Sequence, residues 1–336
     1  GLRIGAHGLP LMGSGDWNDG MDKVGNEGRG ESVWLAFFLY DVLDRFQELA
    51  RSRKDIEFAD RCKKESFQLK KNIELSSWDG NWYLRAFFDD GTPLGSSKNE
   101  ECKIDSIPQS WSVISGAGNA AHSRSAMNAA YSHLVKKEQS LIQLFDPPFN
   151  LAVPNPGYIR GYLPGVRENG GQYTHAAIWL IMATAALEDK QRTYELIQMV
   201  NPLNHGSTPT SIKKYKTEPY VIAADVYAVE NHEGMGGWTW YTGSAGWMYQ
   251  LLAESFFGLK RTGNRLTIKP CIPDSWNAFE IHYRFTETVY HLKFERNDSV
   301  NHLKLVMDGV DQETNDLMLV NDKVKHEVTI CLPSKT

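Results

Sequence analysis

Apolar residues with helical spacing in two adjoining segments constrain the fold of this chain more than any other feature. In residues 31–49 they recur three or four positions apart, the pattern of an amphipathic helix. They are Val33, Trp34, Phe37, Phe38, Val42, Leu43, Phe46 and Leu49. Residues 56–75 repeat the pattern more weakly, so the sequence predicts a helical hairpin.

Further helical patterns follow this hairpin, separated by long connections rich in Gly, Pro, Trp and Tyr. They cover residues 110–117, 123–135, 175–187, 192–200, 219–229 and 243–257. Long aromatic loops on a helical scaffold usually carry function. Successive helix pairs with their loops on one side suggest a toroid of helical hairpins. About eight helices would leave that ring incomplete.

After Gly263 the pattern changes to short alternating runs. These runs cover residues 266–268, 279–283, 288–294, 302–306 and 324–332, and each reads as a β-strand. We therefore predict a mainly α protein with a small antiparallel β domain at its C-terminal end. The predicted boundaries are 1–260 for the helical part and 261–336 for the β domain. Because residues 1–15 form a Gly-rich loop sequence, we expect the chain to be part of a larger protein.

Charge and cysteine usage narrow the classes of partner. The 336 residues carry a formal net charge of -5, which gives no broad attraction to nucleic acid or to an anionic membrane. Four widely separated cysteines form no C-x-x-C pair, so we predict neither a metal site nor a disulfide framework. The longest apolar run, 178–187, is far too short for a membrane span. A cytoplasmic location fits best, including the cytoplasmic part of a larger membrane-bound synthase.

The segment GDWNDG at residues 15–20 is the first candidate for chemistry. Its two acids, amide and indole suit a site that hydrogen-bonds a sugar, stacks on its apolar face and donates a proton. The same residues also suit an Asx-rich turn, and the local sequence supports both interpretations equally. A calcium loop is disfavoured because no further acids follow at EF-hand spacing.

Two Gly-rich loops that lead into helices are the other candidates. The segment PGYIRGYLPGVRENGGQYTH ends at His175, and GGWTWYTGSAGW, residues 236–247, contains Thr242 and Gly243. Helix N-terminal amides, a hydroxyl and a histidine suit an oxyanion. Each feature also has a structural interpretation, as a helix cap or a packed residue, and a lone His at a helix start more often has that role.

These motifs resemble glycoside hydrolase family 94, the inverting phosphorylases of cellobiose, chitobiose and related β-glucans. The likeness lies in residues 13–35, 105–118, 155–177, 218–247 and 270–273. The run 156–175 is most similar to the phosphorylase-like region of cyclic β-1,2-glucan synthases and to β-1,2-oligoglucan phosphorylases. The resemblance implies an (α/α)6 barrel, incomplete here, followed by a β-sandwich-like domain, with an N-terminal β-sandwich and early barrel helices before this chain.

The resemblance also implies site residues. Asp19 corresponds to the family's proton donor, and Trp17 to a residue beside the bound sugar, with Asp16 as a structural partner. The phosphate-binding residues correspond to His175, Thr242 and Gly243. We expect Glu168, Gln172 and Tyr173 to be sugar contacts. No cofactor is expected, and inorganic phosphate is the co-substrate.

The implied reaction is phosphorolysis of β-glucosides with inversion, to give α-glucose 1-phosphate, or the reverse synthesis. Phosphate is already a nucleophile, so one acid and an anion pocket suffice, provided that the environment of Asp19 raises its pKa above the usual 4 or so. One alternative is an inverting hydrolase with Glu168 as the base. Another is a non-catalytic glucan-binding or chain-length-control module of a larger synthase. An incomplete barrel would expose apolar helix faces, which self-association or the missing N-terminal region would cover.

Overall fold

The computed structural model describes residues 2–333, and these residues form two units. The first unit contains the described residues up to Leu187 together with Leu196–Trp247. The second contains Glu188–Glu195 together with the described residues from Met248 onward. Helices and sheets are both present, with the larger sheets in the second unit. The predicted boundary between residues 260 and 261 stays a prediction.

Helices dominate the first unit, and two helices, α6 and α9, have residues in both units. They are α1 (Val33–Ser52), α2 (Ile56–Ser76), α3 (Ser106–Ile114), α4 (Ala120–Leu134), α5 (Thr174–Ala186), α6 (Lys190–Val200), α7 (Pro202–His205), α8 (Pro209–Tyr215) and α9 (Thr242–Gln250). Two short 3-10 turns are η1 (Asp19–Met21), in the loop before Glu31, and η2 (Tyr158–Gly161), in the loop before α5. The π-helical η3 (Leu251–Phe256) follows α9. Within residues 2–333, no helix combines the length and the apolar run that a membrane span needs.

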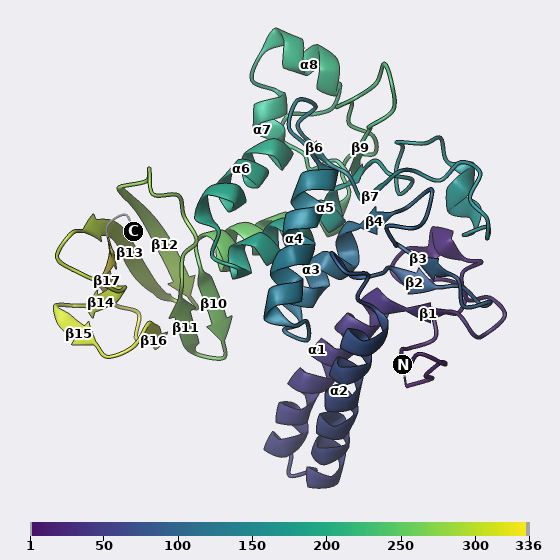
Figure 1. The fold of residues 1–336 in the computed structure, drawn as a ribbon. Helices are drawn as coiled ribbons and strands as arrows, with labels where there is room; N and C mark the ends of the chain where they lie inside the picture. Colours follow the sequence, from purple (N-terminus) through teal and green to yellow (C-terminus); the bar gives the residue numbers. More distant parts are fainter. Residues whose placement is uncertain (1, 334–336) are drawn as a thin grey trace. The chain divides into compact units, whose positions relative to one another are not determined.

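The predicted helical hairpin is confirmed, because α1 and α2 pack side by side (Figure 1). Each of the two helices begins at a polar cap. The Ser32 hydroxyl accepts a hydrogen bond from the Leu35 amide at 3.0 Å, and Asp55 accepts one from the Phe58 amide at 3.1 Å. Such caps satisfy amide groups that have no partner within the helix. The residues Ser32 and Asp55 therefore determine where the two helices of the hairpin begin.

The helix predicted over residues 219–229 is wrong. This segment instead contains β9 (Asp225–Val226), which pairs antiparallel with β8 (Gln172–Tyr173). Its apolar side chains Ala223 and Val226 are buried in a small cluster with Leu141 and Tyr215. Burial in that cluster and pairing with β8 favour an extended chain over a helix.

The first unit also contains short paired strands that hold its loops together. They are β1 (Glu31–Ser32), β2 (Ala86–Phe87), β3 (Pro93–Leu94), β4 (Ile104–Asp105), β5 (Val135–Lys136), β6 (Leu141–Ile142), β7 (Phe145–Asp146), and the pair of β8 and β9. The order β1-β2-β3 forms one sheet, and β4 pairs with β7 and β5 with β6. The strands β2 and β3 pair antiparallel, with Ala86 opposite Leu94 and Phe87 opposite Pro93.

The second unit contains two sheets, with strand orders β12-β13-β17-β14-β15 and β10-β11-β16. The strands are β10 (Leu259–Thr262), β11 (Arg265–Ile268), β12 (Ala278–Phe285), β13 (Thr288–Asn297), β14 (Lys304–Met307), β15 (Val310–Gln312), β16 (Asp316–Met318) and β17 (Lys325–Pro333). A purely antiparallel domain is incorrect, because β13 and β17 run parallel. The long connection between them lets the chain return in the same direction.

A buried charge network fixes the loop at residues 15–20. Both carboxylate oxygens of Asp16 accept hydrogen bonds from the Arg85 guanidinium, at 2.6 and 2.7 Å. Asp16 Oδ2 also accepts one from the Ser32 hydroxyl at 2.6 Å, and Arg85 Nε lies 3.2 Å from Asp105 Oδ2. The side chains of Asp16 and Arg85 are fully buried. The network joins the loop to the start of α1, to β2 and to the cap of α3.

Burial and charge act against each other in this network. Burial raises the pKa of Asp105 to about 6, and the charge of Arg85 opposes that rise. Burial acts in the same direction on Asp16, but the Arg85 charge and its two hydrogen bonds outweigh it, so the pKa of Asp16 lies below its usual value. Arg85 therefore keeps the Asp16 carboxylate fully ionised, and it offsets only part of the rise that burial causes in the pKa of Asp105.

We predict that Arg85→Met lowers the free energy of unfolding by about 3–5 kcal/mol, because it leaves two buried carboxylates without their cation. Urea unfolding at neutral pH measures this loss. The matched control is Arg51→Met, which removes the exposed Arg51–Asp60 ion pair and should cost less than about 1 kcal/mol. Equal effects of the two substitutions would contradict the structural role given to Arg85.

Candidate active site

The loop at residues 15–20 presents one carboxylate outward and keeps the other inside. Both oxygens of the Asp16 carboxylate accept hydrogen bonds from Arg85 within the buried network, in agreement with the predicted structural role of Asp16. The Asn18 side chain accepts a hydrogen bond from the Gly20 amide at 3.1 Å and caps η1. Asp19, the first residue of η1, is exposed, while Trp17 is half-buried beside it. The loop thus holds an exposed acid next to an indole on a rigid base.

The loop that contains η2 packs against this acidic loop. The Tyr158 amide donates to Asp22 at 2.8 Å, and a Cβ on Gly157, whose φ is +129°, would collide with that carboxylate. Glycine is therefore required at 157 for the two loops to approach. The Tyr158 hydroxyl hydrogen-bonds Asp19, and burial together with this contact raises the pKa of Tyr158 to about 12. The phenol is protonated at neutral pH and donates to Asp19.

Glu168 lines a cleft together with Asp19. Its side chain is 13% exposed, and Arg167 Nε lies 3.4 Å from Glu168 Oε2. Burial raises the pKa of Glu168, and the charges of Asp225 and Asp19 add to that rise, whereas Arg167 opposes it. The Arg167 guanidinium also stacks on Tyr162 and Trp238 at 4.9 and 5.1 Å. A second carboxylate and a cation thus adjoin the exposed acid.

His175, the second residue of α5, stands among aromatic rings. Its ring centroid lies 5.5 Å from that of Trp17, 4.2 Å from Trp179 and 5.4 Å from Trp247. This apolar surrounding lowers the pKa of His175 to about 4, so the imidazole is neutral at neutral pH. Its Nε2 atom is buried and has no hydrogen-bond partner. A buried polar atom without a partner favours a ligand at that position.

The N-terminus of α9 opens on the same region as that of α5. Thr242, Gly243 and Ser244 line a cleft together with Tyr173 and His175. Thr242 and Gly243 are exposed, and so are the aromatic side chains just before them, Trp238, Trp240 and Tyr241. Amide groups at two helix starts therefore face one cleft, an arrangement suited to an anion.

Seven of the eight predicted site residues line two adjoining clefts. One cleft is lined by Trp17, Asn18, Asp19, Glu168, Tyr173 and His175. The other is lined by Tyr173, His175, Trp240, Tyr241, Thr242, Gly243 and Ser244. Tyr173 and His175 belong to both, so the clefts share a wall. The donor set suits a sugar and an anion.

Gln172 is the predicted site residue that lines neither cleft. It is 2% exposed, its Oε1 accepts a hydrogen bond from the Ile142 amide at 2.9 Å, and its Nε2 donates to the Thr174 hydroxyl at 3.4 Å. The side chain is oriented inward because β8 alternates, with Tyr173 facing the cleft. The structure thus gives Gln172 a part in holding β8 rather than the predicted sugar contact.

Sequence reasoning did not select Tyr158, Arg167 or Asp225. Asp225 is 1% exposed, opposes Tyr173 in the β8–β9 pair and accepts a hydrogen bond from the Trp238 amide at 3.1 Å. Burial raises its pKa, and its Oδ2 atom has no hydrogen-bond partner. The incorrect helix over 219–229 hid Asp225, whereas Tyr158 and Arg167 lie inside a motif that was recognised as a whole.

Comparisons with known proteins identify the family of this chain. Residues 2–258 match the family described as glycosyl hydrolase 94 superfamily, catalytic domain. A cyclic β-(1,2)-glucan synthase, NdvB, of Rhizobium meliloti is 45% identical over 88% of this chain, which covers 10% of that protein. An N,N'-diacetylchitobiose phosphorylase of Vibrio furnissii is 30% identical over 85% of this chain and 35% of the relative. A 1,2-β-oligoglucan phosphorylase of Listeria innocua is 22% identical over 86% and 28%.

The solved structures support the fold alone, because their sequence identities are low. A sialidase aligns with a TM-score of 0.57 at 14% identity, over 83% of this chain and 25% of that chain. A family GH78 rhamnosidase of Bacillus sp. GL1 aligns with a TM-score of 0.50 at 13% identity, over 91% and 28%.

The chain spans between a tenth and about two fifths of the length of the first curated relatives it matches. The match over residues 2–258 nevertheless includes Asp19, Glu168, His175 and Thr242, and so contains both clefts. The resemblance drawn from the motifs is thereby confirmed. This chain belongs to the glycosyl hydrolase 94 superfamily and carries part of its catalytic domain.

Proposed function

We propose that this chain takes part in inverting phosphorolysis of β-glucosides, or in the reverse synthesis, with α-glucose 1-phosphate as product or donor. The observation that carries the proposal is the pair of adjoining clefts. One contains the exposed acid Asp19, the other contains two helix N-termini, and His175 lines both. An acid for the leaving oxygen and an anion site for the nucleophile are thus placed next to each other.

Asp19 acts as the general acid in this proposal. It protonates the glycosidic oxygen as the bond to the anomeric carbon breaks, and Trp17 offers its face to the sugar ring beside it. This step requires a protonated Asp19 carboxyl in the complex with sugar and phosphate.

Phosphate binds in the second cleft and attacks the anomeric carbon from the face opposite Asp19. His175 Nε2 supplies a hydrogen bond, the Thr242 hydroxyl another, and the amides at the starts of α5 and α9 face the anion. A neutral imidazole donates one proton from the nitrogen that faces the ligand. Because phosphate is itself a nucleophile, the mechanism needs no carboxylate base. Phosphate is a co-substrate here, and no cofactor takes part.

The relatives' names suggest the substrate. The 45% identical relative is a cyclic β-(1,2)-glucan synthase, and a more distant relative is a 1,2-β-oligoglucan phosphorylase. We therefore propose β-1,2-linked gluco-oligosaccharides as substrate or product. Glu168 and Tyr173, which line the acid cleft, contact the sugar. The half-buried Arg167, stacked between Tyr162 and Trp238, holds the loop that presents Glu168.

Two other functions are supported by specific observations. Glu168, a carboxyl with a raised pKa in the same cleft as Asp19, is suited to be the base of an inverting hydrolase. The exposed rings of Trp238, Trp240 and Tyr241 would suffice for a glucan-binding module without turnover. The unpartnered His175 Nε2 favours phosphorolysis over both, because neither needs an anion site there.

We further propose that the first unit is part of an (α/α)6 barrel. The α1–α2 hairpin exposes large apolar side chains, which an adjoining element would cover. They include Phe46, Leu49, Ile56, Phe67 and Leu75. An N-terminal segment of the same protein or a second copy of this chain is the proposed cover. A cytoplasmic location, within a larger synthase, accompanies this proposal.

Asp19→Asn should lower glucose 1-phosphate release by about 10²- to 10⁴-fold, because the amide cannot donate a proton to the leaving oxygen. Release from β-1,2-gluco-oligosaccharides and from cellobiose is measured with and without inorganic phosphate. The protein is this chain, together with a version extended at its N-terminus. The parent protein should release glucose 1-phosphate only when phosphate is present.

The control for this experiment is Asp22→Asn, which keeps an oxygen that accepts the Tyr158 amide and should change the rate little. Free glucose at equal rates with and without phosphate would show a hydrolase instead. Saturable oligosaccharide binding with no turnover in either form would support the binding module. Full activity of Asp19→Asn would remove Asp19 from the mechanism.

His175→Ala should weaken phosphate binding by about 10- to 150-fold, because a hydrogen bond to a charged group contributes roughly 1.5–3 kcal/mol. Burial lowers the pKa of His175 to about 4, so its neutral form is fully populated above about pH 5.5. The contribution of His175 to phosphate affinity should therefore not change near pH 6.5. Phosphate titrations from pH 5.5 to 8, with NMR of the imidazole, measure both quantities.

The matched control is His232→Ala, which removes an exposed histidine that lines neither cleft. Its phosphate affinity should equal that of the parent protein. An imidazole of His175 that titrates near pH 6.5 without phosphate would contradict the neutral state assigned to it. Unchanged phosphate affinity in His175→Ala would contradict its role in the anion site.

A further inference from the structure

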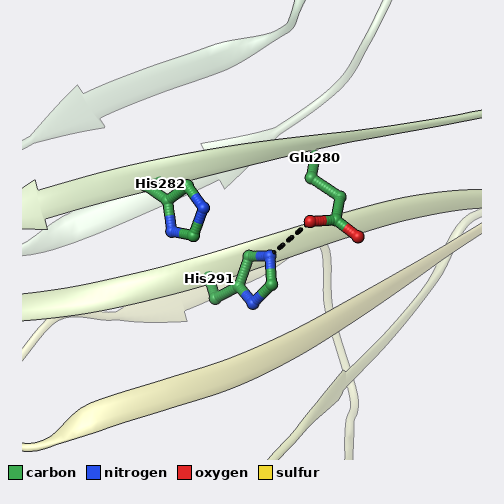
Figure 2. Close-up of side chains that lie close together, drawn as sticks. All are labelled: Glu280, His282 and His291. Carbon is green, nitrogen blue, oxygen red and sulfur yellow. Dashed lines mark hydrogen bonds and ion pairs between the residues drawn. The ribbon is translucent and has the colours of Figure 1, made fainter.

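A second group of chemically competent side chains lies on the five-stranded sheet of the second unit. Glu280 and His282 are two residues apart on β12 and so project from the same face of the sheet. His291 on β13 stands in register opposite His282, and Glu327 on β17 stands in register beside His291. Strand alternation and register together gather these four side chains, and Figure 2 shows three of them, Glu280, His282 and His291.

The distances in this group suit a shared ligand. One donor atom from each of Glu280, His282 and His291 lies within 4.8 Å of the others. His291 Nε2 is 2.7 Å from Glu280 Oε2, and the two imidazole rings are stacked with centroids 4.4 Å apart (Figure 2). His291 is only 8% exposed, so packing fixes its ring, whereas the Glu280 side chain is 58% exposed and free to adjust.

Both ring nitrogens of His291 face carboxylates. Nε2 approaches Glu280 at 2.7 Å, and Nδ1 lies 3.0 Å from Glu327 Oε2. A neutral imidazole carries one N–H and can donate to only one of the two carboxylates, so a protonated ring or a bound cation is needed to satisfy both. A metal ion at Nε2 meets this requirement and leaves Nδ1, which forms no hydrogen bond in the structure, 3.0 Å from Glu327 Oε2.

We propose that Glu280, His282 and His291 form a binding site for a zinc-type divalent cation. Metal bonds of about 2.0–2.2 Å in a tetrahedron place ligand atoms about 3.3–3.5 Å apart. The 2.7 Å contact between His291 and Glu280 must therefore open by about 0.6 Å, which the exposed Glu280 allows. Three protein ligands leave the fourth position to water.

Coordination chemistry rather than charge selects the ion. Glu327 is paired with Lys293 at 3.0 Å and with Lys325 at 2.8 Å, so the local charge before binding is close to balanced. Calcium and magnesium prefer sites of oxygen ligands, whereas imidazole suits zinc, nickel and copper. The site should therefore discriminate strongly against calcium and magnesium.

A comparison with His326 on β17 shows why two flanking carboxylates alone are insufficient. His326 Nδ1 lies 2.6 Å from Asp308, and its Nε2 lies 3.1 Å from Asp322. The two carboxylates contact different ring nitrogens, and within residues 2–333 these three residues do not form a converging ligand group. His326 is therefore an ion-paired histidine. His291 differs because a second imidazole, that of His282, lies beside its Nε2 contact with Glu280.

Cysteine spacing predicted no metal site. His282 and His291 meet only through the register of β12 and β13, which leaves no local motif in the sequence. The proposal is independent of the phosphorylase proposal, because these residues lie in neither cleft.

Isothermal titration of the chelator-treated chain with zinc chloride, in a phosphate-free buffer, tests the proposal. We expect saturable binding of one zinc ion and a higher thermal midpoint with zinc, and neither effect with magnesium or calcium. The double variant His282→Ala/His291→Ala should weaken zinc binding by more than about 100-fold. Because all four cysteines are buried, thiols should not compete for the ion.

The matched control is His302→Ala, which removes an exposed histidine of the same unit and should leave zinc affinity unchanged. Glu280→Gln, at an exposed position that tolerates the change, should weaken zinc binding by at least about tenfold while circular dichroism stays that of the parent. No saturable zinc binding by the parent chain would overturn the proposal. Equal zinc affinity of the parent and the double variant would also overturn it.

Discussion

The rest of the active site depends on the buried ion network of Asp16, Arg85 and Asp105. The buried Arg85 guanidinium pairs with the buried carboxylates of Asp16 and Asp105. These contacts join the acidic loop to the first helix, to β2 and to the cap of α3. Buried charge pairs contribute little net stability, yet they are costly to break. Their effect here is positional, because Trp17 and Asp19 follow directly after the anchored Asp16. An exposed acid on an unanchored loop would lose its alignment with a neighbouring ligand site.

The aromatic surroundings of His175 perform a similar task for the anion site. Three indole rings exclude water from one side of the imidazole and keep it neutral. A neutral donor next to two helix N-termini binds an anion without adding a full positive charge, and the amide groups supply the remaining field. The acid cleft is therefore held by the network of Asp16, Arg85 and Asp105, and the anion cleft by the indole rings around His175.

Much of this arrangement was predictable from sequence. Helical spacing predicted α1 and α2, and the order of the motifs indicated the family. Seven of eight predicted site residues line the clefts, because each motif lies at a helix start where local sequence fixes the backbone. The failures share one cause, dependence on distant partners. Within residues 219–229, Asp225–Val226 form β9 because β8 pairs with it, and Gln172 faces inward because of that same pair.

Inversion at the anomeric carbon is the central claim of this account, since it requires the acid and the phosphate on opposite faces of the sugar. Proton NMR of the first sugar phosphate formed, recorded before any anomeric equilibration, reports that geometry directly. The account predicts α-glucose 1-phosphate from a β-linked substrate, with the anomeric proton coupled to phosphorus. Formation of β-glucose 1-phosphate, or of free glucose alone, would contradict it.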